Sequence, residues 1–294
     1  QNADLGPRMA GQECDCDFLA SGDTVFEPED MAFYEETYQK DPLERRGIDG
    51  NLWIWEGVDY TKSYMVVADV ARGDSADYSA CHVFDIETAT QVAEYKGKLS
   101  PKDYGNFLVG LATEYNNALL VIENANIGWA TIEQAITREY NNIYYSSTTQ
   151  VESVESYMNK YERDKLVPGF TMSARTRPLV IAKMIEYIRE HSVTIQSKRL
   201  MAEMRVFVWK NGKPQAQVRY NDDLLIACAT ALYVRDTALK LRQQGIDLAR
   251  AQLSSFNNMN ARNKAVIKNV GNQQNNPYLI ETPGGPEDIS WLLK

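Results

Sequence analysis

Histidine and cysteine are scarce in this sequence, and their scarcity excludes several common chemistries. With only His82 and His191, a Ser-His-Asp or Cys-His catalytic arrangement has few candidates. Cys14 and Cys16 have a spacing that suggests a metal motif, but no four-ligand zinc pattern can be completed around them. We therefore expect all four cysteines of the chain to be reduced thiols, as is usual in the cytosol.

Long apolar runs and nucleotide-binding loops are absent as well. No run of about 18 apolar residues occurs, so we expect no membrane span. The first residues, QNADLGPRMAGQECDCD, lack the apolar core of a signal peptide, which favours a cytoplasmic location. Neither a G-x-x-x-x-G-K-[ST] phosphate loop nor a G-x-G-x-x-G motif after the first predicted strand is present, so an ATPase of that class is excluded for these residues.

The sequence also lacks the basic excess that is typical of proteins that bind nucleic acids unaided. Its formal net charge is −9 over 294 residues. A nuclease stays compatible with this value, because catalytic carboxylates and acidic tails lower the total, or because another subunit holds the DNA. The hydrophobic content of 44% is enough for a sizeable core in one large α/β domain with appendages or in two small domains.

The middle of the chain alternates strand-like and helix-like segments. An apolar run over Tyr64–Val70 predicts a buried strand, and the alternating stretches Ala80–Ile86 and Thr90–Lys96 predict a hairpin. Ser100 as N-cap predicts a helix over Pro101–Asn116. The further predicted elements are a strand over Ala118–Glu123, a helix over Gly128–Tyr140, a short strand over Ile143–Tyr145, a long loop over 146–172, a helix over Thr176–His191, a short strand over Ser192–Ile195, a helix or strand over Arg199–Val208, a hairpin turn over Lys210–Lys213 and a long helix over Asp222–Leu241. This order predicts a mixed central sheet flanked by helices.

The two ends of the chain differ in character from the middle. Residues 1–50 are polar and irregular, with one short helix predicted within Glu27–Lys40 and a loop from Asp41 that leads into an aromatic strand. Residues 242–294 are rich in Asn, Gln, Gly and Pro, which predicts a tail that is at least partly flexible. The tail closes on an apolar cluster that either docks on a partner or packs back on the domain. The central domain is therefore expected over residues 51–241.

Acidic residues stand at the ends of the buried segments, where a purely structural role explains them poorly. Asp69 ends the first apolar strand, and Glu123 ends the strand after the first helix. An isolated carboxylate in a buried strand is costly without a partner. Asp222 and Asp223 open the late helix, where they are also compatible with simple capping. Asp74 and Asp77 are expected to be turn formers, with a site role as the alternative.

The order of these acids along the chain predicts that they converge. In a ribonuclease-H-like sheet the first strand lies beside the strand that follows the first helix, and the start of a later helix reaches the same edge. Clustered carboxylates repel one another unless a cation neutralises them. Hard divalent ions such as Mg²⁺ or Mn²⁺ take such oxygen ligands, and two of them about 4 Å apart suit phosphodiester hydrolysis. We therefore predict a two-ion site at Asp69, Glu123 and the acids at 222–223.

Four segments, in the order YMVVADVARGDSADYSACHVFD, LLVIENANIGWATIEQAI, GFTMSARTRPLVIAKMIEYI and YNDDLLIACATAL, resemble successive nuclease motifs of phage large terminase subunits, the T4-like group in particular. The resemblance covers residues 60–235. It implies a ribonuclease-H-like α/β fold in which Asp69, Glu123 and one of Asp222 or Asp223 bind the metals. Asn221 stands where the family usually has a histidine, and the pattern leaves open which of the two following aspartates is the ligand.

The N-terminal stretch GQECDCDFLASGDTVFEPEDM is similar to the end of the terminase ATPase domain and its linker. That similarity implies that residues 1–50 join the nuclease domain to an ATPase domain upstream. The family also implies double-stranded DNA, the portal protein and the small terminase subunit as partners, and the host cytoplasm as the location.

Basic residues near the predicted site are candidates for contacts to the DNA backbone, which would carry little sequence information. The alternative for each is a solvated surface charge. The candidates are Arg72, Lys160, Arg163, Lys165, Arg175 and Arg177.

The predicted function is a metal-dependent endonuclease that cuts concatemeric double-stranded viral DNA during packaging, with low sequence specificity. Two alternatives stay open. One is another nuclease of the same fold class, such as a junction resolvase. The other is a non-catalytic module that guides DNA or docks on the portal, which the acidic net charge allows.

Overall fold

The computed structural model describes residues 24–239 except 48, 73–76, 126, 148–165 and 237, together with the backbone of 279–282 and 285–288. Residues 1–240 and 241–294 form two separate compact units. In the second unit, β11 (Leu279–Thr282) pairs with β12 (Gly285–Asp288) in an antiparallel hairpin. No helix in the described part of the chain has the length and apolar character needed to cross a membrane.

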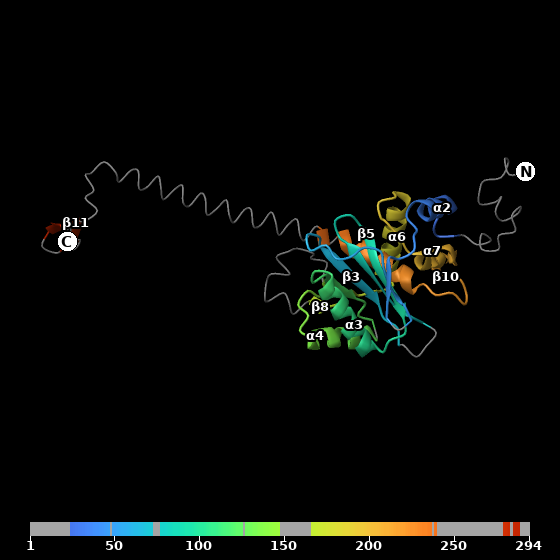
Figure 1. Cartoon of the computed structure of the whole chain (residues 1–294), viewed down its shortest axis with the longest axis horizontal. Helices are drawn as coiled ribbons and strands as arrows, with labels where there is room; N and C mark the ends of the chain where they lie inside the picture. The colour runs from blue at the N-terminus through green and yellow to red at the C-terminus, as the bar shows by residue number, and fades with distance from the viewer. Residues whose placement is uncertain are drawn as a thin grey trace, which may run out of the picture. The chain divides into compact units, whose positions relative to one another are not determined.

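A six-stranded sheet forms the centre of the first unit (Figure 1). Its strand order is β1-β2-β5-β4-β3-β6, with β3 and β6 parallel and the other neighbours antiparallel. The strands are β1 (Glu44–Arg46), β2 (Leu52–Ile54), β3 (Tyr64–Asp69), β4 (Ser79–Asp85), β5 (Thr90–Gly97) and β6 (Leu119–Ile122). The predicted mixed sheet and its central hairpin are therefore confirmed.

Helices cover both faces of this sheet (Figure 1). On β3, Tyr64, Val66 and Ala68 belong to a core shared with two of the helices, while Met65 and Val67 belong to the core on the other face. This alternation follows from the period of two along a strand. The first face carries α3 (Pro101–Glu114) and α4 (Gly128–Thr137); the second carries α2 (Pro28–Thr37), α6 (Thr176–Arg189), α7 (Lys198–Arg205) and a helix at 223–236.

Several local predictions are confirmed by the hydrogen bonds and backbone angles. The Ser100 hydroxyl accepts the backbone N–H of Asp103 at 3.2 Å and so caps α3. Asn211 and Gly212 have positive φ angles of 53° and 71°, as expected for the tight turn of a hairpin. That turn joins β9 (Phe207–Lys210) to β10 (Lys213–Ala216). Both described cysteines are buried free thiols.

Other segments differ from their predictions. The expected loop after residue 41 contains β1, which is polar and fully exposed and therefore shows no apolar pattern. The expected loop over 146–172 contains β7 (Tyr145–Ser147) and β8 (Leu166–Pro168), which pair with each other. The predicted strand over Ser192–Ile195 is reduced to one bridge between Thr90 and Thr194, because its neighbours along the chain turn away into α7.

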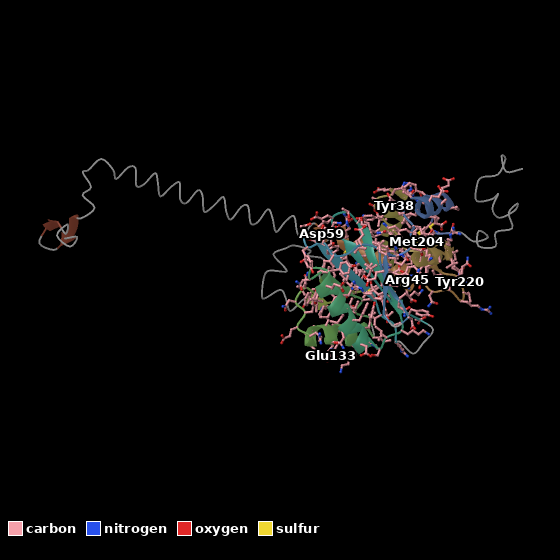
Figure 2. The ribbon with its side chains drawn as sticks, in the orientation of Figure 1. Tyr38, Arg45, Asp59, Glu133, Met204 and Tyr220 are labelled. Carbon is pink, nitrogen blue, oxygen red and sulfur yellow. The ribbon has the colours of Figure 1, made fainter. Side chains whose placement is uncertain are left out.

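The N-terminal segment packs into the first unit. Val25, Phe26, Met31 and Tyr34 are buried in the core that also contains the helix at 223–236. Glu133 on α4, labelled in Figure 2, is exposed, whereas Met204 on α7 is buried. Residues 25–34 therefore pack against the part of the core that supports the sheet with the acidic residues.

Candidate metal centre

Asp69 and Glu123 reach the same edge of the sheet because β3 and β6 run parallel. Ala68 and Ile122 are register partners, and the next residue on each strand is the acid. The backbone N–H of Glu123 donates to the carbonyl of Ala68 at 3.1 Å, which continues the ladder to the acidic pair. Parallel pairing places equivalent strand ends side by side. The register therefore brings together the two carboxylates that the sequence singled out.

Two close glycine approaches shape the backbone around Glu123. A Cβ on Gly128, at the start of α4, would lie 1.7 Å from the carbonyl oxygen of Glu123. Gly169 has a φ of +85°, and a Cβ there would lie 2.5 Å from the carbonyl oxygen of Ile122. Only glycine accommodates these approaches without a backbone shift. Both positions hold the turn after β6 in the geometry that presents Glu123.

The start of the helix at 223–236 brings Asp222 and Asp223 to the same place, but their side chains differ in partners. Asp222 forms an ion pair with Arg177 at 2.9 Å. The carboxylate of Asp223 accepts the backbone N–H of Tyr78 at 3.2 Å and the side-chain amide of Asn221 at 3.1 Å. Asp223 is thus oriented by neutral donors, whereas Asp222 is already neutralised by a guanidinium.

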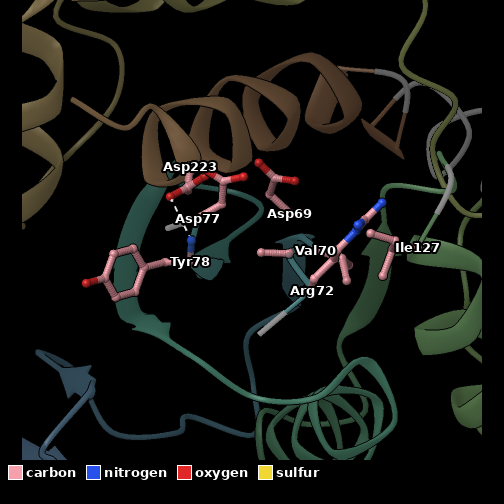
Figure 3. Close-up of a pocket in the computed structure, with 8 residues that line it drawn as sticks. Asp69, Val70, Arg72, Asp77, Tyr78, Ile127 and Asp223 are labelled. Carbon is pink, nitrogen blue, oxygen red and sulfur yellow. Dashed lines mark hydrogen bonds between the residues drawn. The ribbon is translucent and has the colours of Figure 1, made fainter. Parts of the chain in front are cut away.

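Two hollows meet at Asp69. The larger, of about 440 Å³, is lined by Asp69, Asp77 and Asp223 together with Arg72 and Tyr78 (Figure 3). The smaller, of about 170 Å³, is lined by Asp69 and Glu123. In Figure 3 the carboxylates of the three aspartates lie near one another beneath the helix at 223–236, and the Tyr78 ring points away from them. The hollow is open enough to admit a ligand to the carboxylates.

The electrostatics of this cluster are unfavourable without a cation. Burial raises the pKa of Asp69 well above its ordinary value, and the charges of its three acidic neighbours raise it further. Burial also raises the pKa of Glu123 and that of Asp223. Within the described residues, no basic side chain forms an ion pair with any of these three acids. Arg177 lowers the pKa of Glu123 and Lys96 lowers that of Asp223, but burial is the larger effect on both carboxyl groups.

The donor set fits a hard divalent cation. It consists of carboxylate oxygens from three separate chain segments, with no thiolate or imidazole among them. Among the described residues, no three acidic, histidine or cysteine side chains are close enough together to hold one metal ion in the present geometry.

The predicted basic residues are placed unequally. Arg72 is exposed and lines the larger hollow, and its guanidinium points toward Ile127 rather than the acids (Figure 3). Arg175 is exposed at the start of α6. Arg177 forms an ion pair with Asp222, so its guanidinium already has a partner within the protein. Lys160, Arg163 and Lys165 lie outside the described residues.

Sequence reasoning missed the residues that contribute through backbone groups or position alone. Tyr78 holds Asp223 by a backbone N–H, a donor that every residue but proline carries, so no sequence pattern marks it. Asp77 lines the larger hollow, although the turn pattern favoured a structural role. The departure at Asn221 was visible, and its amide reaches Asp223.

A buried polar network supports the start of the same helix. His82 Nε2 donates to the carbonyl of Leu224 at 2.9 Å, and its Nδ1 accepts from Gln91 at 2.9 Å. Burial lowers the pKa of His82, which agrees with a neutral ring in these two roles. Glu203 accepts the backbone N–H of Leu225 at 3.0 Å and pairs with Lys96. Hydrogen bonds from His82 and to Glu203 therefore fix the first turn of the helix that follows Asp222.

Comparison with known proteins yields matches among solved structures. The nuclease of the large terminase from thermophilic phage G20c, with bound cobalt or with bound magnesium, matches with a TM-score of 0.54 and 19% identity, covering 72% of this chain and 97% of that one. The large terminase nuclease domain of Thermus phage P74-26 matches with a TM-score of 0.52 and 20% identity, covering 71% and 94%. No protein-family model matches the chain, and no curated protein does. The chain therefore has the ribonuclease-H-like fold of these nuclease domains, as predicted.

Proposed function

We propose that this chain carries a metal-dependent nuclease of the large-terminase kind. The observation that carries the proposal is the approach of Asp69, Glu123 and Asp223 to one another in two hollows that share Asp69, where none of the three forms an ion pair with a described residue. The shared fold supports it, because the G20c nuclease was solved with cobalt and with magnesium bound. The carboxylates hold ions in this proposal and do not act as proton donors.

Asp69, Glu123 and Asp223 would hold Mg²⁺ or Mn²⁺, with two ions as the expected number. Asp223 is preferred over Asp222 because it lines the hollow with Asp69, whereas Asp222 is paired with Arg177. When bound, such ions activate a water and stabilise the leaving oxygen of a phosphodiester. The protein's own contribution is to orient Asp223 through Tyr78 and Asn221, and to present the strand-end acids at a fixed register.

The proposed substrate is concatemeric double-stranded viral DNA. Water attacks phosphorus and the 3′ oxygen departs, which leaves a 5′ phosphate. Exposed arginines such as Arg72 and Arg175 would contact the phosphate backbone, and such contacts give low sequence specificity. The net charge of −9 agrees with DNA held partly by other components of a packaging motor. Those proposed partners are an upstream ATPase domain, the portal protein and the small terminase subunit, in the host cytoplasm.

The proposal is tested on end-labelled linear duplexes and four-way junctions of the same sequence, with Mg²⁺, Mn²⁺ or EDTA. We expect duplex cutting with either metal at many positions, none in EDTA, and products that a ligase accepts through their 5′ phosphate. Cutting confined to the junction would move the assignment to a resolvase of the same fold class. Binding of DNA without cutting in either metal would favour a DNA-guiding or portal-docking module.

A further inference from the structure

A third hollow, of about 880 Å³, adjoins the hollow that is lined by Asp69, Asp77 and Asp223. It runs between the β5 end of the sheet and α3, and aromatic and basic side chains stand along it. Tyr78 lines both hollows. The further charged and aromatic lining residues are Arg46, Asp49, Tyr95, Lys96, Lys98, Phe107 and Glu114.

Tyr78 connects the two hollows through different atoms. Its backbone N–H donates to the carboxylate of Asp223 at 3.2 Å, on the acidic side. Its ring points away from the acids (Figure 3) and lies under two ammonium groups, those of Lys96 at 5.2 Å and Lys98 at 5.0 Å from the ring centre. Tyr78 is 36% exposed. An aromatic ring flanked by two lysine ammonium groups therefore adjoins the proposed metal centre.

The positive charge available in this hollow resides chiefly on Lys98. Lys96 is paired with Glu203, and Arg46 is paired with Glu44 and Glu114. Lys98 is exposed, and it forms no ion pair with any residue in the described part of the chain. A phosphate in the hollow would therefore find its free cationic partner at the Tyr78 end.

We propose that this hollow binds the DNA strand that flanks the scissile phosphate, with Lys98 on a backbone phosphate and the Tyr78 ring against the adjoining sugar or base. The proposal rests on the proposed nuclease function and adds where the substrate strand continues. Sites for single nucleic-acid strands combine cationic and aromatic side chains, and Lys98 beside the Tyr78 ring would offer the same two contacts to the backbone of one strand of a duplex. Because Tyr78 lines both hollows, they adjoin at this residue, as a strand that passes the cutting site requires.

The test is equilibrium binding of the full chain to a fluorescent duplex oligonucleotide, measured in EDTA over a series of salt concentrations. Lys98→Gln removes one phosphate contact, so we expect weaker binding and a salt slope that is shallower by about 1. Tyr78→Leu keeps the backbone N–H for Asp223 and removes the ring, so we expect affinity to fall at least about fivefold. Lys40→Gln is the matched control, because Lys40 is exposed and lines neither hollow.

Thermal unfolding of each variant first establishes that it is folded. Lys98→Gln and Tyr78→Leu variants that are folded and bind as tightly as Lys40→Gln at every salt concentration would overturn the proposal. Because EDTA prevents cutting, binding and cleavage are scored separately. If cleavage depends on Asp69 but binding is unchanged in Lys98→Gln, the strand site alone is rejected. If binding depends on Lys98 but the chain cuts DNA with neither metal, the nuclease function alone is rejected.

Discussion

At the scale of single residues, the surroundings of Asp69 disfavour its ionised carboxylate unless a cation is present. Its pKa is raised in the folded, metal-free protein by burial and by three acidic neighbours. Above its ordinary pKa of about 3.8, the unfolded chain releases this proton while the folded chain retains it. The contribution of Asp69 to stability therefore declines as the pH rises from there.

Replacement of Asp69 by Asn should therefore stabilise the metal-free protein at neutral pH. We expect Asp69→Asn to unfold at a higher temperature than the wild type at pH 7 in EDTA, with the difference shrinking toward pH 4. Added Mg²⁺ should raise the unfolding temperature of the wild type and leave the variant unchanged. Thermal unfolding over this pH range checks both. A variant that is less stable at pH 7 in EDTA contradicts the electrostatic account.

The two adjacent aspartates should differ as metal ligands. Asp223 lines the hollow with Asp69, and Asp222 is neutralised by Arg177. We expect Asp223→Asn to weaken Mn²⁺ binding by more than about 100-fold, and Asp222→Asn to weaken it less, within the range of about 10–100-fold that outer partners of a ligand show. Calorimetric Mn²⁺ titration of both variants measures this. The reverse order would make Asp222 the ligand.

At this scale the sequence was informative wherever a side chain broke a pattern. Asp69 and Glu123 interrupt apolar strands, and the structure brings both to one edge. The pairing of Arg177 with Asp222 joins positions 45 residues apart, and no sequence pattern predicts that these two side chains meet. The backbone donor of Tyr78 has no sequence signal at all.

At the scale of secondary-structure elements, the turn between β6 and α4 depends on one close backbone approach. Gly128→Ala places a Cβ 1.7 Å from the carbonyl of Glu123, so the turn must shift. We expect a loss of at least about 2 kcal/mol in the free energy of unfolding, together with weaker Mn²⁺ binding through Glu123. Urea unfolding and the Mn²⁺ titration measure the two effects.

Gly110 in α3 provides the matched control, because an added Cβ there meets nothing within 4 Å. Gly110→Ala should stabilise the protein by up to about 1 kcal/mol, since glycine is costly inside a helix. Equal destabilisation by the two substitutions would mean that the turn after β6 has no special constraint.

Elements with a strong apolar period were predictable, and those without one were not. β3 and β6 are short buried runs, and α3 has both a cap and a helical period. β1 is exposed over all three residues, and its place in the sheet comes from pairing with β2. Such a strand is specified by its neighbours and not by its own composition.

At the scale of the whole molecule, the described cores lie within residues 25–239. The segment 241–294 forms a compact unit of its own. We expect a chain that ends at residue 240 to unfold within about 2 °C of the full chain, because 1 kcal/mol corresponds to about 2–4 °C in a domain of this size. Calorimetry on both chains checks this. A larger drop would mean that the C-terminal unit stabilises the sheet domain.

The central claim is that the carboxylate cluster at Asp69 is a metal centre that cuts DNA. The most direct measurement is the conversion of supercoiled plasmid to nicked and linear forms with Mg²⁺ or Mn²⁺, by the wild type, Asp69→Asn and Asp41→Asn. Asp41 is the matched control, because its side chain is 73% exposed and lines neither hollow at Asp69. We predict metal-dependent cutting by the wild type and by Asp41→Asn, and at least about a 100-fold loss in Asp69→Asn. Equal cutting by all three, or no cutting with either metal, would contradict the account.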